Sequence, residues 1–290
     1  MPTRSPQGIP PDVLARANAQ SQRLRALVRA PEILVMPGAH DVLSAQIYER
    51  LGFKAIQGSS GGIAAADGYP DGEVIPFERT VEATARIAEA VSVPVNADGE
   101  KGYADAAHIG DTIKAFIRAG AAGMNLEDSA HPVPGQPRGL VPLEQFLKKV
   151  AAVMDTKKAV GSEFFLNARV DAFLIIRHDP PAALREGIRR GQAYAEAGAD
   201  CIFFMATPEP EVIRTLVREI PAPVSVLAGA HHPSVREMQE LGVARVSYGT
   251  AFARVAAGAI RRLAAEIMEK GTVSSLEADA IPLDYGRARD

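Results

Sequence analysis

Eight short runs rich in branched apolar residues recur along the chain and alternate with stretches that have the periodicity of amphipathic helices. Short apolar runs bounded by turn residues predict buried strands, and strands that alternate with helices predict a parallel sheet. Eight such units close on themselves, so the sequence predicts a (β/α)8 barrel of the TIM type. The expected strands are 33–38, 55–58, 93–96, 123–126, 164–168, 201–204, 224–227 and 245–248.

Helix boundaries support this alternation. A helix is expected over residues 11–28, and the next one begins after Asp41, which is a favourable N-cap residue. Later amphipathic runs end on glycines such as Gly120 and Gly198 before a new strand begins. A doubly wound open sheet is the alternative. It loses support because residues 37–41 read Pro-Gly-Ala-His-Asp, where a dinucleotide-binding fold carries Gly-x-Gly-x-x-Gly.

The composition points to one domain and a small ligand. The 290 residues contain no interior linker or charge block, so a single domain over residues 1–290 is expected, with short extensions at both ends. A net charge of −3 does not predict the basic surface of proteins that bind nucleic acid or anionic membranes. We therefore expect a small-molecule partner, with neither nucleic acid nor membrane.

Hydropathy and cysteine content suggest a cytoplasmic location. No apolar stretch approaches the roughly 18 residues that span a bilayer, and residues 1–11 lack the hydrophobic segment of a secretory signal. The single cysteine, Cys201, lies in an apolar run, which predicts a buried core thiol. Neither a disulfide nor a multi-thiolate metal site is expected.

Acidic residues stand where two neighbouring expected strands end. Asp98 and Glu100 follow the third strand, and Glu127 follows the fourth. In (β/α)8 barrels the chemistry sits at the carboxyl ends of the strands. Carboxylate oxygens suit hard cations such as Mg²⁺ or Mn²⁺, and no histidine or cysteine joins these acids, which argues against zinc. The sequence therefore predicts a divalent metal site at this rim.

Two further strand ends could bind an anion at the same rim. Residues 58–62 read Gly-Ser-Ser-Gly-Gly and offer backbone N–H groups that can approach an anionic oxygen closely. Arg169, at the fifth strand, offers a guanidinium suited to a carboxylate. Two simpler alternatives stay open: the Ser59 loop is only a turn, and the rim acids form ion pairs with Lys101, Arg138 or Arg169.

Four of these segments resemble a known family. Residues 95–103 read Val-Asn-Ala-Asp-Gly-Glu-Lys-Gly-Tyr, and residues 123–128 read Gly-Met-Asn-Leu-Glu-Asp. Together with residues 58–60 and 167–171, they resemble the isocitrate lyase/phosphoenolpyruvate mutase superfamily, in order from about residue 35 to 249. The resemblance implies a Mg²⁺-dependent barrel that makes or breaks a C–C or P–C bond beside a 2-oxo or 2-hydroxy acid, through an enolate-like species.

The resemblance also implies roles for individual acids. Asp98 would be the main metal ligand, while Glu100 and Glu127 would hold metal-bound waters. Asp71 would be the rim acid that follows the serine-glycine loop. A metal chelated by the 2-oxo acid would stabilise the developing enolate as a Lewis acid.

Substrate contacts are implied in the same way. Arg169 would bind the substrate carboxylate. Ser59 and the Ser60 amide would hold the other end of the substrate, with Gly61 beside them. The resemblance therefore implies a site that combines a metal, an arginine and amide donors.

The chain also departs from the superfamily. Isocitrate and methylisocitrate lyases carry a Lys-Lys/Arg-Cys-Gly-His loop after the fourth strand, whereas residues 129–139 contain neither cysteine nor lysine, nor the Lys-x-Asn-Ser of phosphonopyruvate-processing relatives. Residues 204–206, Phe-Met-Ala, replace a glutamate of those lyases, and their strand-seven Asn and Thr fall on Ser225 and His232. Both known loop chemistries are therefore absent, and the substrate stays open.

Three histidines could supply the missing proton transfer. His131 lies in the 129–139 loop, and His231 and His232 follow the seventh strand, on the catalytic side by topology. The alternative is that they are solvated loop residues. The prolines and glycines of the 129–139 loop suggest a segment that closes over the site, in which Arg138 could bind a second carboxylate.

Three functions follow from these features. The leading hypothesis is a Mg²⁺- or Mn²⁺-dependent lyase-like enzyme for a small 2-oxo or 2-hydroxy acid, and its rival is a non-catalytic 2-oxo-acid binder that keeps the metal. A Schiff-base aldolase is disfavoured because no expected strand carries a lysine. The apolar helix expected over residues 251–268 and the family resemblance together predict homotetramers that exchange this helix between subunits.

Overall fold

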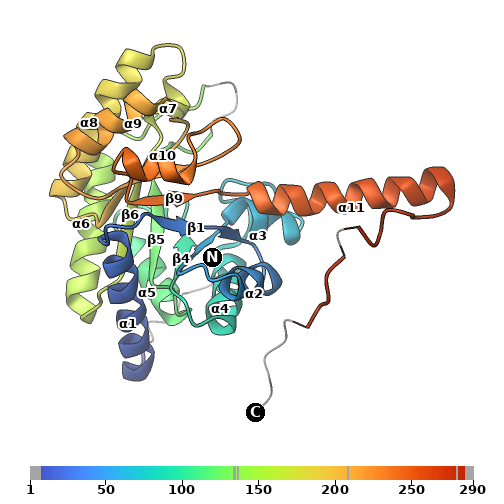
Figure 1. Cartoon of the computed structure of the whole chain (residues 1–290). Coiled ribbons are helices and arrows are strands. Elements are labelled where there is room, and N and C mark those ends of the chain that lie inside the picture. The colour runs from blue at the N-terminus through green and yellow to red at the C-terminus, as the bar shows by residue number, and fades with distance from the viewer. Residues whose placement is uncertain (1–7, 133–134, 136, 208, 279, 285–290) are drawn as a thin grey trace.

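In a computed structural model, which describes residues 8–132, 135, 137–207, 209–278 and 280–284, nine parallel strands form one sheet surrounded by helices (Figure 1). The strands are β1 (Leu34–Met36), β2 (Gly38–Ala39), β3 (Ile56–Gly58), β4 (Val95–Asp98), β5 (Gly123–Glu127), β6 (Phe165–Val170), β7 (Cys201–Phe204), β8 (Val224–Leu227) and β9 (Arg245–Ser247).

The sheet closes into a barrel through its first strand. Its order is β1-β9-β8-β7-β6-β5-β4-β3-β2, so β1 and β2 stand at opposite ends of the order. Only Pro37, which has no N–H to donate, separates the two in the chain. They are two halves of one interrupted strand, and the predicted (β/α)8 barrel is confirmed with its first strand in two pieces.

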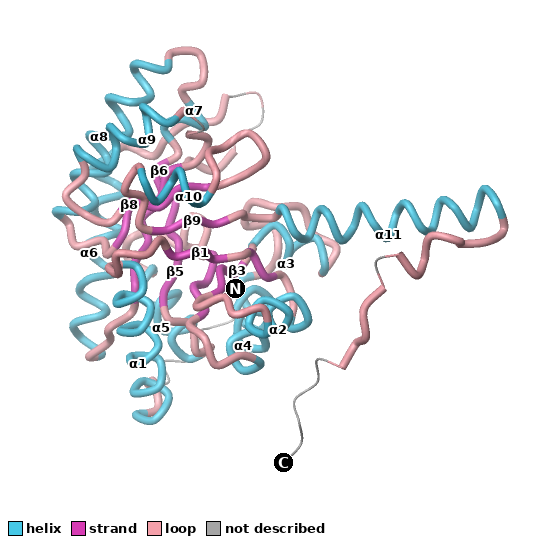
Figure 2. The backbone as a smooth tube through the Cα atoms, viewed as in Figure 1, coloured by secondary structure: helices cyan, strands magenta, loops and turns pink. Residues whose placement is uncertain are grey.

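Most helices pack around the outside of the barrel (Figure 2). They are α1 (Pro11–Val28), α2 (Val42–Arg50), α3 (Ser60–Ala66), α4 (Phe77–Ala90), α5 (Ile109–Arg118), α6 (Leu143–Val160), α7 (Ala172–Ile175), α8 (Pro180–Glu196), α9 (Pro210–Glu219), α10 (Val235–Glu240) and α11 (Ala251–Lys270). The predicted bounds of α1 are confirmed. So is the Asp41 cap of α2, whose carboxylate accepts a hydrogen bond of 2.8 Å from Ser44 N.

The two sides of the strands differ in character. Outward side chains such as Leu126 and Leu166 are fully buried and join the apolar core that lies against the helices. On other positions of the same strands, Asn125 Oδ1 accepts hydrogen bonds from Asn96 Nδ2 at 3.0 Å and from Asn167 Nδ2 at 2.7 Å. This amide ladder links β4, β5 and β6, and so fixes the relative heights of the strands that carry the rim acids.

Helix α11 projects away from the barrel (Figures 1 and 2). None of its described residues is buried, and Val255 and Ile260 are 72% and 69% exposed. Its beginning contacts the barrel, where the rings of Phe252 and Tyr48 lie 5.3 Å apart. Across the described residues, the helices are too short or too polar for any one of them to cross a membrane.

Candidate active site

Glu127 and Arg169 lie side by side at the carboxyl ends of β5 and β6. The two residues are partners in the sheet register, and Arg169 Nη1 lies 2.6 Å from Glu127 Oε2. The carboxylate of Asp171 accepts from Arg169 Nε at 2.7 Å and from Nη2 at 3.0 Å, which fixes the guanidinium plane. Burial alone would lower the pKa of Arg169. The negative charges of Glu127 and Asp171 outweigh the effect of burial and hold this pKa above its usual value.

Asp98 ends β4 next to this pair. Its Oδ2 accepts hydrogen bonds from Ser60 Oγ at 2.7 Å and from Ser60 N at 3.2 Å. Its Oδ1 is buried and has no hydrogen-bond partner in the described part of the chain. Burial raises the pKa of Asp98, and the nearby Arg169 only partly offsets this effect. One carboxylate oxygen is therefore held in place while the other is available to a ligand.

Glu100 is placed by an unusual backbone. Its φ is +44°, a left-handed conformation that is strained for a residue with a side chain. A hydrogen bond of 2.7 Å from Glu127 N to Glu100 O holds it there, and a Cβ at Gly99 would lie 2.7 Å from Asn125 O. Tyr103 OH donates to Glu100 Oε1 at 3.1 Å. Burial, followed by the negative charges of nearby acids, raises the pKa of Glu100 to about 8.

Glu127 has the opposite electrostatic environment. Burial alone would raise its pKa, but the charges of Arg169 and then Lys101 outweigh burial and hold the pKa below its ordinary value. Lys101 Nζ lies 3.2 Å from Glu127 Oε1, and Ser129 Oγ donates to the same oxygen at 2.7 Å. The ion-pair alternative for the rim acids is thus realised for Glu127 with Lys101 and Arg169.

The rim acids fit a cation held largely through waters. Among the residues that the structure describes, no three His, Cys, Asp or Glu side chains are grouped closely enough to hold a metal directly. The buried, unpartnered Oδ1 of Asp98 can supply one direct bond, and the pKa of Glu100 is raised by burial first and then by the negative charges of Asp98 and Asp71. Such an all-oxygen donor set suits a hard divalent cation that keeps several waters.

The loop after β3 meets the same rim. Ser59 and Ser60 lie at the start of α3, and Ser59 Oγ is buried without a partner among the described residues. A Cβ at Gly61 would lie 3.0 Å from Asp71 Oδ2, so the exposed Asp71 side chain folds over the beginning of this helix. The structure therefore brings Ser59, Ser60, Gly61 and Asp71 to the side of the rim that carries Asp98.

A family assignment follows from comparison with known sequences. The family described as phosphoenolpyruvate phosphomutase matches residues 24–268 of the chain. The chain belongs to the phosphoenolpyruvate phosphomutase family. The resemblance to the isocitrate lyase/phosphoenolpyruvate mutase superfamily is thereby confirmed, and an enzyme of this lyase and mutase type fits the chain.

Individual relatives of this phosphomutase-family chain carry different activities in their names. It is 30% identical to phosphonopyruvate hydrolase of Variovorax sp. (strain Pal2), over 91% of each chain. It is 32% identical to 2,3-dimethylmalate lyase of Eubacterium barkeri, over 82% of each chain. Among solved structures, a phosphonopyruvate hydrolase complex with oxalate and Mg⁺⁺ has a TM-score of 0.79 at 29% identity, covering 91% of this chain and 92% of that one.

The other predicted site residues lie apart from this group. His131 is 65% exposed, and its Nε2 lies 3.4 Å from Glu73 Oε2. His231 and Arg138 are exposed, whereas His232 is half-buried with both ring nitrogens unpartnered among the described residues. Throughout the described ranges, no hydrogen bond or ion pair joins these four side chains to Asp98, Glu127 or Arg169. Positions 133, 134 and 136 of the 129–139 loop lie outside the described residues.

Sequence reasoning missed three supporting residues. Asp171 fixes Arg169, and its signal was the two-residue spacing that puts both side chains on one side of a strand. Tyr103 contacts Glu100, and its only signal in the sequence is its place in the 95–103 motif. Arg245 is fully buried inside the barrel and donates to Gln57 Oε1. Its signal was a lone charged residue in an apolar strand.

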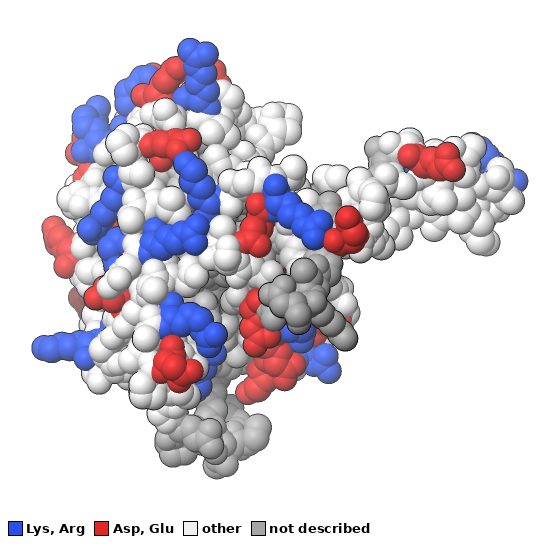
Figure 3. Space-filling model, turned by 60° about the horizontal axis from the view of Figure 1, so that its bottom comes forward, with Lys and Arg blue, Asp and Glu red and all other residues white. Residues whose placement is uncertain are grey.

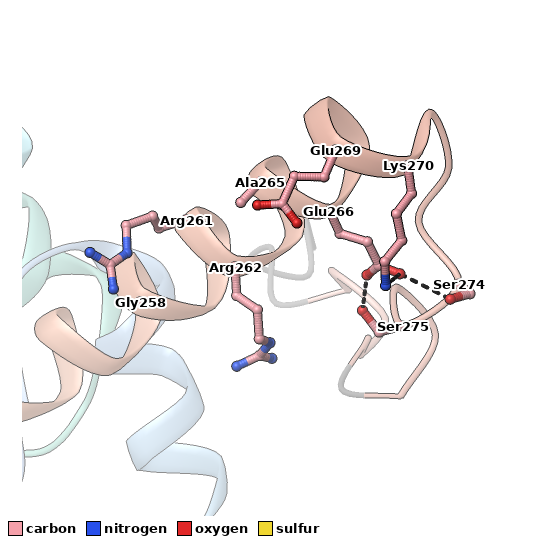
Figure 4. Close-up of a pocket in the computed structure, with 9 residues that line it drawn as sticks. All are labelled: Gly258, Arg261, Arg262, Ala265, Glu266, Glu269, Lys270, Ser274 and Ser275. Carbon is pink, nitrogen blue, oxygen red and sulfur yellow. Dashed lines mark hydrogen bonds and ion pairs between the residues drawn. The ribbon is translucent and has the colours of Figure 1, made fainter.

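A cavity that is lined by none of the rim acids lies along α11. It has a volume of about 830 Å³ and is formed by α11 and the segment after it (Figure 4). Glu266 accepts hydrogen bonds there from Ser274 at 2.9 Å and from Ser275 at 2.5 Å. The cavity contains none of the side chains that the family resemblance assigns to catalysis.

Positive and negative side chains are interspersed over the face of the molecule in Figure 3, including the projecting arm.

Proposed function

We propose that this protein is a Mg²⁺- or Mn²⁺-dependent lyase-like enzyme for a small 2-oxo or 2-hydroxy carboxylic acid. A C–C or P–C bond of the substrate would break, and its electron pair would pass into an enolate. The observation that carries the proposal is the free, buried Oδ1 of Asp98 at the same rim as the fixed guanidinium of Arg169. Relatives named for phosphonopyruvate and 2,3-dimethylmalate, and the related complex with oxalate and Mg⁺⁺, support this substrate class.

The rim acids would hold the metal. Asp98 would bind it directly through Oδ1, while Glu100 and Glu127 would contact its waters. When bound, a divalent cation supplies Lewis-acid stabilisation of the oxygen that becomes negative as the enolate forms. Ser60 keeps Asp98 oriented for this role through its two hydrogen bonds to Oδ2.

Arg169 would bind the substrate carboxylate. Asp171 accepts two of the five guanidinium N–H groups, which leaves three for Glu127 and for a ligand. Because Asp171 and Glu127 hold the guanidinium in one orientation, little rotational freedom is lost when a carboxylate binds. Ser59, Ser60 and Gly61 would hold the opposite end of the substrate, where Ser59 Oγ is free to donate.

Proton transfer would fall to Asp71, His131, His231 or His232. His232 is half-buried, and burial lowers its pKa below 6.5, so its neutral imidazole would be able to accept a proton near neutral pH. His131 is oriented by Glu73, and the exposed Asp71 lies over the start of α3. Arg138 would bind a second carboxylate if the substrate is a dicarboxylic acid.

A non-catalytic binder of 2-oxo acids is the second candidate. It is favoured by one observation: none of the four proposed proton-transfer residues has a hydrogen bond or ion pair to Asp98, Glu127 or Arg169 within the described ranges. A Schiff-base aldolase is disfavoured, because none of the described strands carries a lysine, and Lys101, which follows β4, lies 3.2 Å from Glu127 Oε1.

Turnover and binding assays separate the two candidates. Oxaloacetate, phosphonopyruvate and 2-methylisocitrate-type hydroxy acids would be incubated with the protein and Mg²⁺ or Mn²⁺, and products followed by NMR. Cleavage that disappears on chelation supports the enzyme. Calorimetric binding of oxalate, with no turnover of any panel member, would favour the binder. The variant Asp98→Asn, with nearly unchanged shape, is the control for metal dependence.

The assembly is also proposed. Helix α11 leaves the barrel with apolar side chains such as Val255 and Ile260 that are 72% and 69% exposed, and we infer that it packs against another subunit in a homotetramer. Light scattering should then give a mass about four times the chain mass of 30.7 kDa.

A further inference from the structure

A buried ion pair lies directly behind the rim. Arg190 of α8 and Asp128, the residue after Glu127, have side chains that are 4% and 0% exposed, and Arg190 Nη1 donates to Asp128 Oδ2 at 3.0 Å. Tyr194 OH donates to the same oxygen at 2.7 Å. Glu186 Oε1, one turn earlier on α8, accepts from Arg190 Nε at 2.7 Å. The guanidinium is therefore oriented on two sides by carboxylates.

Arg190 also holds a second segment of the chain. Its Nη2 donates to Val141 O at 2.9 Å. Val141 N in turn donates to Asp128 O at 2.8 Å, and Ala130 N donates to Gly139 O at 2.8 Å. Ser129 and Leu140 pair as an antiparallel bridge between these bonds. Residues 128–130 and 139–141 thus form a short two-stranded stem, and one guanidinium is bonded to both of its strands.

The stem is connected to the candidate active site at two points. Ser129, within the stem, donates to Glu127 Oε1 at 2.7 Å. Asp128 Oδ1 accepts from Asp171 N at 2.8 Å, and the Asp171 carboxylate holds Arg169. The same buried pair therefore supports the backbone on both sides of the Glu127–Arg169 contact.

We propose that Arg190 is a positioning residue, which sets the placement of the 128–130/139–141 stem and, through Asp128 and Asp171, the orientation of Arg169 toward the substrate carboxylate. The substrate part of this inference rests on the proposed function. The structural part does not, because it concerns contacts within the chain alone. A guanidinium is suited to this role, since its planar set of donors can reach Asp128, Val141 and Glu186 together, which a lysine ammonium cannot do.

The test compares two variants, each of which changes one of the two residues that bond to the Asp128 carboxylate. Arg190→Lys keeps the positive charge but loses the simultaneous contacts. Tyr194→Phe removes the hydrogen bond to Asp128 and the 3.1 Å bond that Tyr194 OH accepts from Arg190 Nη1, but it leaves the bonds from Arg190 to Asp128, Val141 and Glu186. Hydrogen–deuterium exchange is measured on peptides covering residues 128–132, 137–142 and 165–172. Oxalate affinity is measured by calorimetry with Mg²⁺ present. Thermal unfolding of each variant is followed in parallel.

For Arg190→Lys we expect exchange in these three peptides to rise by about tenfold, while the peptides of α1 and α5 stay unchanged. Oxalate affinity should fall by about tenfold, the size commonly seen when outer contacts of a site are lost. Tyr194→Phe should leave the 137–142 peptide unchanged, because the Val141 contact remains. In a turnover assay, KM should rise more than kcat falls.

Two results would overturn the inference: unchanged exchange in the stem, or a uniform rise over the whole chain, which would show a loss of global stability only. If wild-type protein binds no oxalate, the proposed function is in doubt, but the exchange data still decide the structural part. If Arg190→Lys fails to fold, Glu186→Gln replaces it. This variant replaces the carboxylate that accepts from Arg190 Nε with a neutral amide, which weakens the contact at a partly exposed position and should raise stem exchange in the same peptides by a smaller factor.

Discussion

Arg169 Nη1 lies 2.6 Å from Glu127 Oε2, and the two residues are register partners on β6 and β5. The contact joins a predicted substrate-binding residue to a predicted metal ligand. Each residue therefore stabilises the charged form of the other, which lowers the pKa of Glu127 and raises the pKa of Arg169. A ligand that binds Arg169 is placed next to the acids proposed to hold the cation, so affinity for the ligand and for the metal should be coupled.

The first prediction concerns the metal. Asp98→Ala should abolish metal-dependent binding of oxalate, because it removes the free Oδ1 that we propose as the direct protein ligand. Glu100→Ala should weaken binding by only about tenfold, through lost contacts to metal-bound waters. Calorimetric titration of Mg²⁺ and oxalate into each variant provides the measurement. Wild-type affinity in the Asp98 variant would contradict the metal assignment.

The second prediction concerns the substrate carboxylate. Arg169→Lys keeps the charge, but lysine cannot make both bonds to Asp171 and also present a fixed pair of donors to a ligand. We expect KM for the best 2-oxo acid of the panel to rise by at least about tenfold. Arg218→Lys, on α9 with a side chain that is 65% exposed, serves as the matched control. Equal kinetics in both variants would place the anion site elsewhere.

The architecture was predictable because it depends on patterns that repeat along the chain. Every expected strand is present, and positive φ values at Gly120 and Gly198 confirm two of the predicted helix ends. The break of the first strand at Pro37 was not predicted. Pro37 falls within the expected apolar run, and nothing in that run showed that the strand would be divided there.

The contacts that orient the site were less accessible to sequence. Asp128 and Arg190 are 62 positions apart, and their pairing depends on how α8 packs against β6 and β7, which no local pattern encodes. Lys101 was considered as an ion-pair partner, and the structure shows it against Glu127. Arg138, considered in the same way, is exposed instead. Partner choice among several nearby charges is decided by backbone geometry, such as the left-handed turn at Glu100.

The third prediction is a pH dependence of stability. Burial lowers the pKa of His232 below the 6.5 of an unperturbed histidine. Between the two values the unfolded chain binds more protons than the folded one, so stability falls as the pH drops below 6.5 and through the lowered pKa. His232→Gln should therefore lose less Tm than wild type between about pH 7.5 and about pH 5.5. His231→Gln, at the exposed neighbouring position, should follow wild type; identical curves for all three proteins would contradict the burial of His232.

The fourth prediction concerns assembly. Val255 and Ile260 are 72% and 69% exposed on α11, so a charge at either position should not disturb the fold of one isolated chain. If α11 packs against another subunit, Val255→Glu and Ile260→Glu should each lower the mass measured by light scattering. Truncation after Thr250 should cost both assembly and solubility. Wild-type protein running as a monomer of 30.7 kDa would exclude the tetramer.

The fifth prediction concerns the segment between the two strands of the stem, which carries His131 and Arg138. Arg138 is exposed and therefore available to a ligand, whereas His131 lies beside Glu73. If Arg138 binds a second carboxylate, Arg138→Ala should raise KM for oxaloacetate by about tenfold and leave KM for a monocarboxylic 2-oxo acid nearly unchanged. His131→Asn should lower kcat instead if His131 transfers a proton, since that loss affects a chemical step rather than binding. If both variants match wild type on both substrates, neither Arg138 nor His131 acts on the substrate. Proton transfer would then be left to Asp71, His231 or His232, and specificity to the segment after β8 that carries the two histidines.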